Sequence, residues 1–307
     1  MLSHAIAAAL MGFAETALAL GGAPAPLHGA LLAPDDPPQA IAVILAGSGP
    51  TDRNGNNPQG LRTDTYRLLA EGLAERGIAT VRADKRGIAE STEAGPAEPD
   101  LRFDAYVEDA RAWAAEAAER TGQRCAWLIG HSEGALVAEA ATAEDDGAIC
   151  GLVLVSGAGR PARALLEEQL TALPEPLKTQ AYDALAELEA GRTVPDTPPQ
   201  LAALLRPSVQ PYLISWMALD PAALIADYDG PVMIGQGTTD LQVSMADAEA
   251  LAAAQPNARF VTWEGVNHIL KAAPAERAAN LATYADPSLP LGPGIVDDVA
   301  DFILEPR

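Results

Sequence analysis

Short runs of apolar residues alternate with longer amphipathic stretches over most of the chain. After residue 40 the apolar runs recur at 41–46, 80–83, 126–129, 152–155, 232–234 and 260–263. Runs of this length fit strands that are buried on both faces of a parallel sheet. Because amphipathic stretches such as 103–120 lie between runs, the pattern predicts an α/β sheet with helices on both faces.

The residues before this repeat have a different character. Residues 14–32 predict an antiparallel hairpin that leads into the sheet, with its turn near Gly21 and Gly22. Residues 1–20 are apolar enough to suggest a signal peptide. However, they lack the Lys or Arg with which a signal peptide begins, and Glu15 interrupts the apolar stretch. We therefore expect a short helix, a first strand and a cytoplasmic protein, with an export signal as the alternative. No later apolar run is long enough to predict a membrane-spanning helix.

One long region contains no predicted strand. Helical segments are predicted instead at 161–173, 177–190 and 200–205. The leucines of the first segment form an apolar stripe, and the region is far longer than an ordinary connection between a strand and a helix. The sequence thus predicts a helical cap insertion at 157–228, carried by a core that comprises 1–156 and 229–307.

Composition and charge narrow the possible functions. Apolar residues make up 49% of the 307 residues, and 20 Lys and Arg against 42 Asp and Glu give a net charge of −22. Such a charge repels phosphate groups, so neither nucleic acid nor an anionic membrane is an expected partner. Cys125 and Cys150 each open an apolar run. They are too few for a disulfide framework or a zinc site, and we expect buried thiols at strand edges.

The strongest chemical signal is the run Gly-His-Ser-Glu-Gly at 130–134, a G-x-S-x-G motif. It follows the predicted strand 126–129 and opens a predicted helix at 135–141. In this context the serine is exposed above the sheet on a tight turn. The N-terminus of the helix also places N–H groups and positive dipole near Ser132. We interpret Ser132 as a nucleophile, with a serine that only caps the helix as the structural alternative.

A serine nucleophile needs a general base, and the base needs an orienting carboxylate. His268 follows the last predicted strand, at the edge of a parallel sheet where active sites form. Asp240 follows the preceding strand, so the chain order Ser132, Asp240, His268 is that of α/β-hydrolases. Glu264, just before the His268 loop, is the competing carboxylate. His131 is expected to be structural because its side chain should point away from Ser132.

Two backbone N–H donors are needed to stabilise an oxyanion. The N–H of Glu133, directly after the nucleophile, is one candidate. The loop Gly-Ser-Gly-Pro at 47–50 follows the first buried strand, and either Ser48 or Gly49 is expected to supply the second donor. Charged residues on nearby loops are expected to form a polar network that stabilises this loop, with a clamp for a substrate carboxylate as the alternative use of Arg53 or Arg86. These residues are Asp52, Arg53, Asp84, Lys85 and Arg86.

A family resemblance rests on the segments 46–56 (AGSGPTDRNGN), 84–87 (DKRG), 130–134 (GHSEG), 237–243 (GTTDLQV) and 265–268 (GVNH). In them the chain resembles an α/β-hydrolase, and more narrowly the bacterial acyl-esterase and serine aminopeptidase type, from about residue 14 to its end. The resemblance implies this fold and the roles given above to the triad and the oxyanion donors. Ala46 stands where many members carry a histidine, which removes a side-chain support but no N–H donor.

Together these features predict a serine hydrolase that cleaves small carboxylic esters or thioesters through an acyl-enzyme, without a metal or organic cofactor. Tyr212, Trp216 and Met217, in the predicted cap, are candidates for an apolar wall of the substrate site. Two alternatives remain. A serine aminopeptidase or amidase would use the same triad, and a catalytically silent binding protein would keep only the fold.

Overall fold

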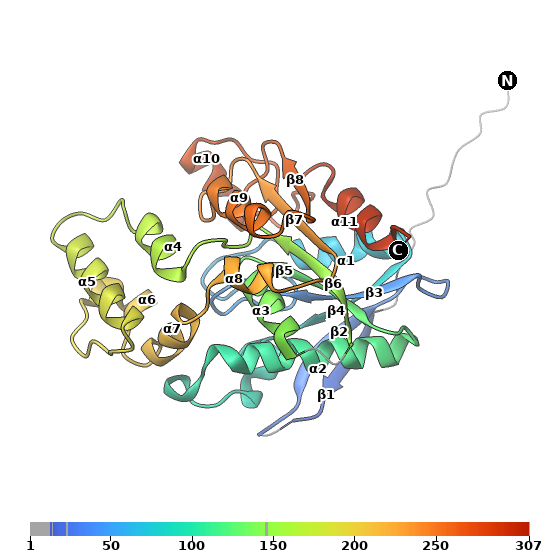
Figure 1. The fold of residues 1–307 in the computed structure, drawn as a ribbon, viewed down its shortest axis with the longest axis horizontal. Coiled ribbons are helices and arrows are strands. Elements are labelled where there is room, and N and C mark those ends of the chain that lie inside the picture. The colour runs from blue at the N-terminus through green and yellow to red at the C-terminus, as the bar shows by residue number, and fades with distance from the viewer. Residues whose placement is uncertain (1–12, 14, 23, 145–146, 307) are drawn as a thin grey trace.

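An eight-stranded, mostly parallel sheet forms the centre of the computed structural model, which describes residues 13, 15–22, 24–144 and 147–306 (Figure 1). The strands are β1 (Glu15–Leu20), β2 (Leu27–Leu32), β3 (Ala40–Leu45), β4 (Ile78–Ala83), β5 (Ala126–His131), β6 (Ile149–Val155), β7 (Val232–Gly237) and β8 (Arg259–Trp263). Each of the six apolar runs is a strand, which confirms the predicted sheet. The short helix expected before β1 falls on residues that the structure does not describe.

The strand order β1-β2-β4-β3-β5-β6-β7-β8 decides where a site can form. Strands β1 and β2 pair antiparallel, and so do β2 and β4, which confirms the predicted N-terminal hairpin. The neighbours from β4 through β3 to β8 are all parallel. The carboxyl ends of β3, β5, β7 and β8 therefore meet at one edge of the sheet, and the loops that follow them carry the candidate residues.

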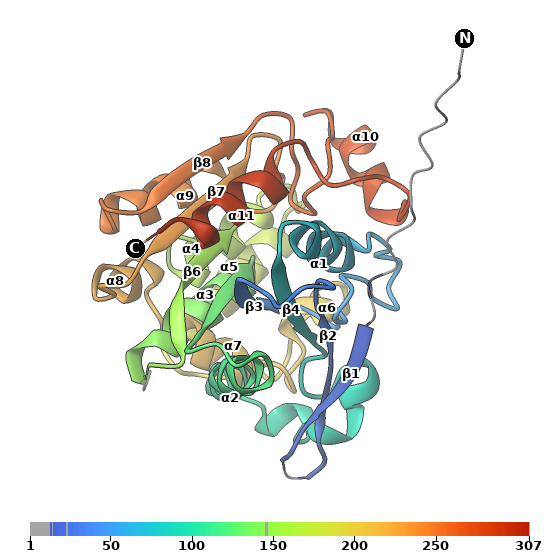
Figure 2. The same ribbon diagram turned by 90° about the vertical axis from the view of Figure 1, so that its right-hand side faces the viewer.

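Helices cover both faces of the sheet (Figure 2). Helices α1 (Thr65–Glu75) and α11 (Ile295–Leu304) pack on one face, and α2 (Phe103–Thr121), α3 (Glu133–Ala141) and α9 (Met245–Ala254) pack on the other. Each face has its own apolar cluster, with Leu73 and Val299 in one and Trp113 and Leu251 in the other. The remaining short elements of the core are η1 (Ala89–Ala94), η2 (Glu98–Asp100), η3 (Thr142–Glu144), α10 (Arg277–Ala282) and η5 (Thr283–Ala285).

The segment 157–228 contains helices and no strand. These are α4 (Ala162–Gln169), α5 (Leu177–Glu189), η4 (Pro199–Leu201), α6 (Ala202–Leu205), α7 (Gln210–Met217) and α8 (Pro221–Ala226). Figure 1 shows α4 to α7 at the left, beyond the end of the sheet where β6 leads into this segment. Leu165 and Leu166, two residues of the predicted apolar stripe, are buried. The helical character expected for the segment is thus present.

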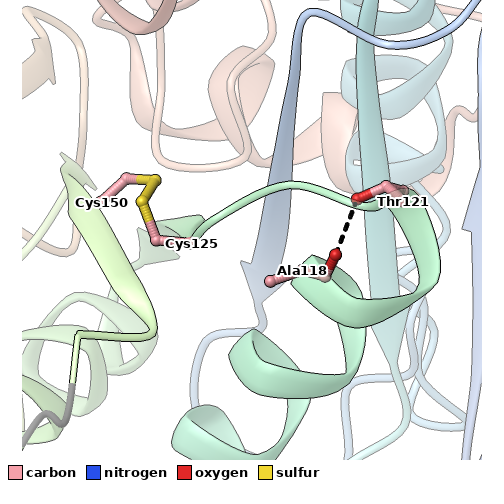
Figure 3. Close-up of a disulfide and its surroundings, with 4 residues drawn as sticks. All are labelled: Ala118, Thr121, Cys125 and Cys150. Carbon is pink, nitrogen blue, oxygen red and sulfur yellow. Dashed lines mark hydrogen bonds between the residues drawn. A yellow bond between two sulfur atoms is a disulfide. The ribbon is translucent and has the colours of Figure 1, made fainter.

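The two cysteines form a disulfide, so the prediction of buried free thiols is wrong. Cys125 directly precedes β5 and Cys150 lies in the neighbouring strand β6, with their Cα atoms 5.2 Å apart (Figure 3). The parallel pairing of β5 with β6 brings the starts of both strands together. Sequence spacing alone does not reveal this contact, because the two residues are 25 positions apart. The bond joins the sheet at the edge opposite the candidate site.

Helix α3 buries a carboxyl group that has no partner. The side chain of Glu139 is buried, and neither of its oxygens has a hydrogen-bond partner within the described chain. Burial raises the pKa of Glu139 well above its usual value, and the nearby Asp220 carboxylate raises it further. The group is therefore protonated in the folded protein at pH values where the unfolded chain has already lost the proton.

Replacing Glu139 with Gln is expected to stabilise the protein at high pH and to have little effect near pH 4. A folded-state pKa that is raised means that stability is lost as pH rises above the unfolded pKa, at up to about 1.4 kcal/mol per pH unit. Gln has no proton to lose and escapes this penalty. Thermal unfolding of both proteins between pH 4 and pH 8 measures the effect. A Tm difference that does not grow with pH would contradict the buried, protonated state of Glu139.

Candidate active site

Ser132 lies on a strained turn between β5 and α3. Its backbone has φ 55° and ψ −121°, an unusual conformation for a non-glycine residue. The flanking glycines are required by close packing. A Cβ atom on Gly130 would lie 2.3 Å from the Gly134 carbonyl oxygen, and one on Gly134 would lie 2.3 Å from the Leu45 carbonyl oxygen. The turn therefore has the tight strand–serine–helix geometry that the motif predicts.

Asp240 and His268 meet across the loops that follow β7 and β8. His268 Nδ1 lies 2.8 Å from Asp240 Oδ2, and both side chains are buried. The backbone N–H groups of Gln242 and Val243 donate to Asp240 Oδ1 at 2.8 and 3.0 Å. This is the pairing expected from the sequence, and the competing Glu264 is exposed.

The environment of Asp240 favours its ionised form. Burial alone would raise the pKa of this carboxyl group, but the interaction with His268 and the two N–H donors outweigh burial and lower the pKa. Gln236 contributes a further, longer contact of 3.3 Å from its Nε2 to Asp240 Oδ2. A carboxylate held in this way fixes the ring orientation of His268 and leaves Nε2 for other partners.

Ser132 and His268 line the same cavity without a direct hydrogen bond. In the described chain, neither the Ser132 hydroxyl nor His268 Nε2 has a hydrogen-bond partner, so the Nε2–Oγ bond expected from the sequence is absent. Such bonds are often long before substrate binds and tighten afterwards. The structure thus brings the three residues to one edge of the sheet and forms one of their two expected hydrogen bonds.

The candidate oxyanion donors are free to bind a ligand. Within the described residues, no hydrogen-bond acceptor is found for the N–H groups of Ser48, Gly49 or Glu133. Gly47 differs, because its N–H donates to the Tyr66 hydroxyl at 3.0 Å. Gly49 has a φ of 73°, a conformation that glycine adopts without strain. Ser48, Gly49 and Glu133 all line the larger cavity described below, as Ser132 does.

His131 connects three parts of the site, and protein groups engage both of its ring nitrogens. Its Nδ1 lies 2.8 Å from the Tyr66 hydroxyl, and its Nε2 lies 2.7 Å from the His268 carbonyl oxygen. Since Tyr66 accepts from Gly47, its own proton goes to His131 Nδ1, and Nε2 then carries the proton donated to His268. Burial and the neighbouring His268 lower the pKa of His131 to about 3, so the ring is neutral at working pH.

The charged residues around the 47–50 loop form the expected network. Asp84 accepts the Arg53 N–H at 2.8 Å and the Arg53 guanidinium at 3.1 Å. Arg86 makes hydrogen bonds of 2.6–2.9 Å to both carboxylate oxygens of Asp109. Asp52 accepts two N–H groups within its own turn. Both arginines are thus engaged by protein carboxylates, which argues against the alternative use of either one as a clamp for a substrate carboxylate.

Two cavities meet at Ser132. The smaller, of about 490 Å³, is lined by His268 and by uncharged polar side chains such as Asn57, Gln242 and Tyr284. The larger, of about 710 Å³, has an apolar wall of Leu136, Leu165, Leu166, Leu213 and Trp216. Of the three residues predicted to line the substrate site, Tyr212 and Trp216 line the larger cavity. Met217 is not among the described residues that line either cavity, and it packs against the core instead.

Two functional positions were not identified from the sequence. Tyr66 lies inside an amphipathic helix, where an aromatic residue is ordinary core, and its contacts with Gly47 and His131 depend on the sheet topology. Lys85 was predicted only as a member of the charged network, and the structure places it against the Gly47 carbonyl oxygen. No cluster of three or more potential metal ligands is found in the described ranges.

Comparison with known proteins places the chain among hydrolases. Residues 61–263 match the model of the family described as "Serine aminopeptidase, S33". A search of curated proteins finds no match. No helix within the described residues is long and apolar enough to cross a membrane.

Solved structures have similar folds. Est1E from Butyrivibrio proteoclasticus, also solved with ferulic acid bound, has a TM-score of 0.61 at 18% identity, covering 94% of this chain and 99% of that one. The esterase domain of a Rhodothermus marinus protein has a TM-score of 0.53 at 17% sequence identity, and the match covers 89% of this chain and 93% of that one. Proline iminopeptidase from Mycobacterium smegmatis has a TM-score of 0.55 at 15% sequence identity, and the match covers 83% of this chain and 92% of that one. At these identities the likeness shows the fold alone, and it confirms the fold class expected from the sequence.

Proposed function

Because the chain belongs to the serine aminopeptidase, S33, family of α/β-hydrolases, we propose that it is a serine hydrolase that cleaves carboxylic esters or thioesters. The observation that carries the proposal is the strained turn at Ser132 beside the buried Asp240–His268 pair. These residues have the types, chain order and loop positions of a nucleophile, an orienting acid and a base.

The proposed reaction has two stages. Ser132 Oγ attacks the acyl carbonyl carbon while His268 Nε2 takes the hydroxyl proton, and the N–H groups of the oxyanion hole stabilise the negative oxygen. Collapse breaks the bond to the leaving group, which receives the proton from His268. Water, deprotonated by His268, then attacks the acyl-enzyme, and the bond to Ser132 Oγ breaks as His268 returns the proton to that oxygen, which releases the acid and restores Ser132. Asp240 stabilises the protonated imidazole in both stages.

The two cavities suggest where the parts of a substrate lie. The leaving group must receive a proton from His268, and His268 lines only the smaller, polar cavity. The acyl group then occupies the larger cavity, beside Glu133 and the apolar wall that contains Trp216. A short or medium acyl chain suits that volume and lining. Est1E, one of the proteins with a similar fold, is also solved with ferulic acid, an aromatic carboxylic acid, bound.

The alternative of an aminopeptidase needs an acid that can pair with a substrate amine. The carboxylates that line the cavities are already engaged: Glu133 lies 3.5 Å from Lys85 Nζ, and Glu98 binds Arg206 at 3.0 Å. The smaller cavity has no carboxylate among its lining residues. This pairing favours an ester over a free N-terminus as substrate. The intact set of Ser132, Asp240 and His268 argues against a silent binding protein.

We propose that residues 157–228 are a cap on the core formed by 1–156 and 229–307. Support comes from Leu165 and Leu166 of α4 and from Leu213 and Trp216 of α7, which line the same cavity as Ser132. The cytoplasmic location stays a prediction. The Cys125–Cys150 pairing is a reason to examine it, because disulfides persist mainly in oxidising compartments.

A panel of substrates tests the proposed specificity. With p-nitrophenyl esters, kcat/KM is expected to rise from acetate to octanoate, and amino-acid anilides are expected to react poorly. Trp216→Ala should lower kcat/KM for octanoate about 10-fold and leave acetate nearly unchanged, because the lost surface contacts only the longer chain. Ile214→Ala is the matched control, since this residue of α7 lines neither cavity. A preference for anilides with a free amine would instead support the aminopeptidase.

A further inference from the structure

Lys85 lies in the loop after β4, and its side chain reaches the loop 47–50, which carries the candidate oxyanion donors Ser48 and Gly49. Its Nζ donates to the Gly47 carbonyl oxygen at 2.6 Å. The same ammonium lies 3.5 Å from Glu133 Oε1 and 5.3 Å from the centre of the Tyr106 ring. The Lys85 side chain is only 12% exposed. It thus contacts both segments that carry candidate oxyanion donors, without belonging to the predicted triad.

The contact with Gly47 fixes one peptide group. The Gly47 carbonyl and the Ser48 N–H belong to the same peptide, which is not among the cis bonds of the described chain. In a trans peptide these two groups point in opposite directions, so holding the oxygen toward Lys85 turns the Ser48 N–H away from it. The preceding N–H of Gly47 is held by the Tyr66 hydroxyl at 3.0 Å. The Gly47–Ser48 peptide is therefore held at its oxygen, and the peptide before it is held at its N–H.

This peptide lies directly beside the nucleophile. A Cβ atom built on Gly47 would lie 3.2 Å from Ser132 Cβ. Ser48 and Ser132 line both cavities, so an N–H of this peptide that points away from Lys85 is available to the space where the substrate oxygen would become negative. The peptide that carries the Gly49 N–H, the other candidate donor, is held differently. Its oxygen, the Ser48 carbonyl, accepts from the neutral Thr51 hydroxyl at 3.0 Å and not from a cation in the described chain.

We propose that Lys85 is a positioning residue that orients the Ser48 N–H as the second oxyanion donor. The inference rests on the proposed function and refines it. The ammonium polarises the peptide through its oxygen and so strengthens the N–H on the other side. It also offsets the Glu133 carboxylate, whose charge would otherwise oppose a negative oxygen nearby. Holding the Gly47–Ser48 peptide and compensating the Glu133 charge predict different activities for a variant in which both Lys85 and Glu133 are replaced.

A removable and restorable ammonium provides the test. Lys85→Cys introduces a thiol that 2-bromoethylamine extends to a side chain with an ammonium at nearly the original length. The native cysteines are paired in a disulfide, so position 85 carries the free thiol. Loss of the ammonium is expected to lower kcat about 10²-fold with KM within about threefold, the low end for loss of an oxyanion donor. Aminoethylation should restore kcat, and carboxamidomethylation should not.

A transition-state analogue distinguishes positioning from a structural role. The Ki of a trifluoromethyl ketone, whose adduct with Ser132 carries an oxyanion, should weaken in proportion to the loss of kcat/KM. The affinity for the product carboxylic acid should stay within about threefold. Lys178→Cys, treated in the same way, is the control, since Lys178 lies on α5 and, among the described residues, forms an ion pair with Glu175 alone. Restoration of kcat by aminoethylation also shows that the unmodified variant is folded.

The double variant Lys85→Cys with Glu133→Gln separates the two effects of the ammonium. If Lys85 acts mainly through the Gly47 oxygen, the double variant stays as slow as Lys85→Cys. Recovery of kcat in the double variant would overturn the proposal, and so would a Lys85→Cys enzyme with near-native kcat or a rescue by carboxamidomethylation. Failure of the proposed function looks different, because the native protein would then show no turnover that depends on Ser132.

Discussion

Replacing Ser132 with Ala is expected to lower the rate of ester hydrolysis by about 10⁴-fold or more while the fold is retained. The hydroxyl is the atom that forms the acyl-enzyme, and neither His268 nor the oxyanion donors can replace it. The hydroxyl makes no hydrogen bond within the described residues, so its removal leaves no partner unsatisfied. Steady-state hydrolysis of p-nitrophenyl butyrate, with circular dichroism as the check on folding, measures the effect.

Ser156 provides a matched control for this variant. It directly follows the neighbouring strand β6 and has a similar positive φ of 49°. Its hydroxyl is buried without a hydrogen-bond partner in the described chain, and it lines neither cavity. Ser156→Ala is therefore expected to keep near-native activity. Near-native turnover in Ser132→Ala would show that the turn at 130–134 has no catalytic role.

Replacing Asp240 with Asn is expected to reduce kcat by about 10⁴-fold with little loss of stability, the size of effect that this substitution has in a well-studied protease triad. An amide that donates to Nδ1 places the ring proton on Nε2, where His268 can no longer accept from Ser132. It also removes the charge that stabilises the imidazolium. The N–H donors from Gln242 and Val243 can still bind the amide oxygen, so the loop should keep its shape.

Glu264→Gln is the comparison for this second variant. Glu264 is the competing acid of the sequence, and it is exposed at the end of β8. Its replacement is expected to change kcat by less than about twofold. A large loss in Glu264→Gln together with a small one in Asp240→Asn, measured on the same ester, would transfer the orienting role to Glu264.

The sequence predicted the sheet because a strand buried on both faces must be continuously apolar. The runs at 41–46 and 152–155 lie within or beside β3 and β6 for this reason. Helix α11 was not predicted, although Ile295, Val299 and Phe302 form its buried side. These apolar residues recur at helical spacing, so the sequence carries the signal for this helix. Helices α7 and α8 were not predicted either, although Pro211 and Pro221 lie in their first turns, where proline favours the start of a helix.

The sequence predicts those residues of the candidate site that belong to a local motif or directly follow a strand. Ser132, Asp240 and His268 each follow a strand, so topology alone brings them together. The Cys125–Cys150 bond and the contacts of Tyr66 and Lys85 depend on which strands and helices are neighbours in space. The choice between Ser48 and Gly49 depends on the orientation of one peptide, which no residue pattern specifies.

Covalent labelling with a fluorophosphonate tests the central claim most directly, because the reagent reacts with a serine that a neighbouring base activates. The native protein should gain one phosphonyl group per chain, located by peptide mass spectrometry on Ser132, and should lose its esterase activity in step. Ser132→Ala should gain none, whereas Ser156→Ala should be labelled like the native protein. An unlabelled native protein, or a label on a residue other than Ser132, would contradict the assignment of Ser132 as the nucleophile of a serine hydrolase.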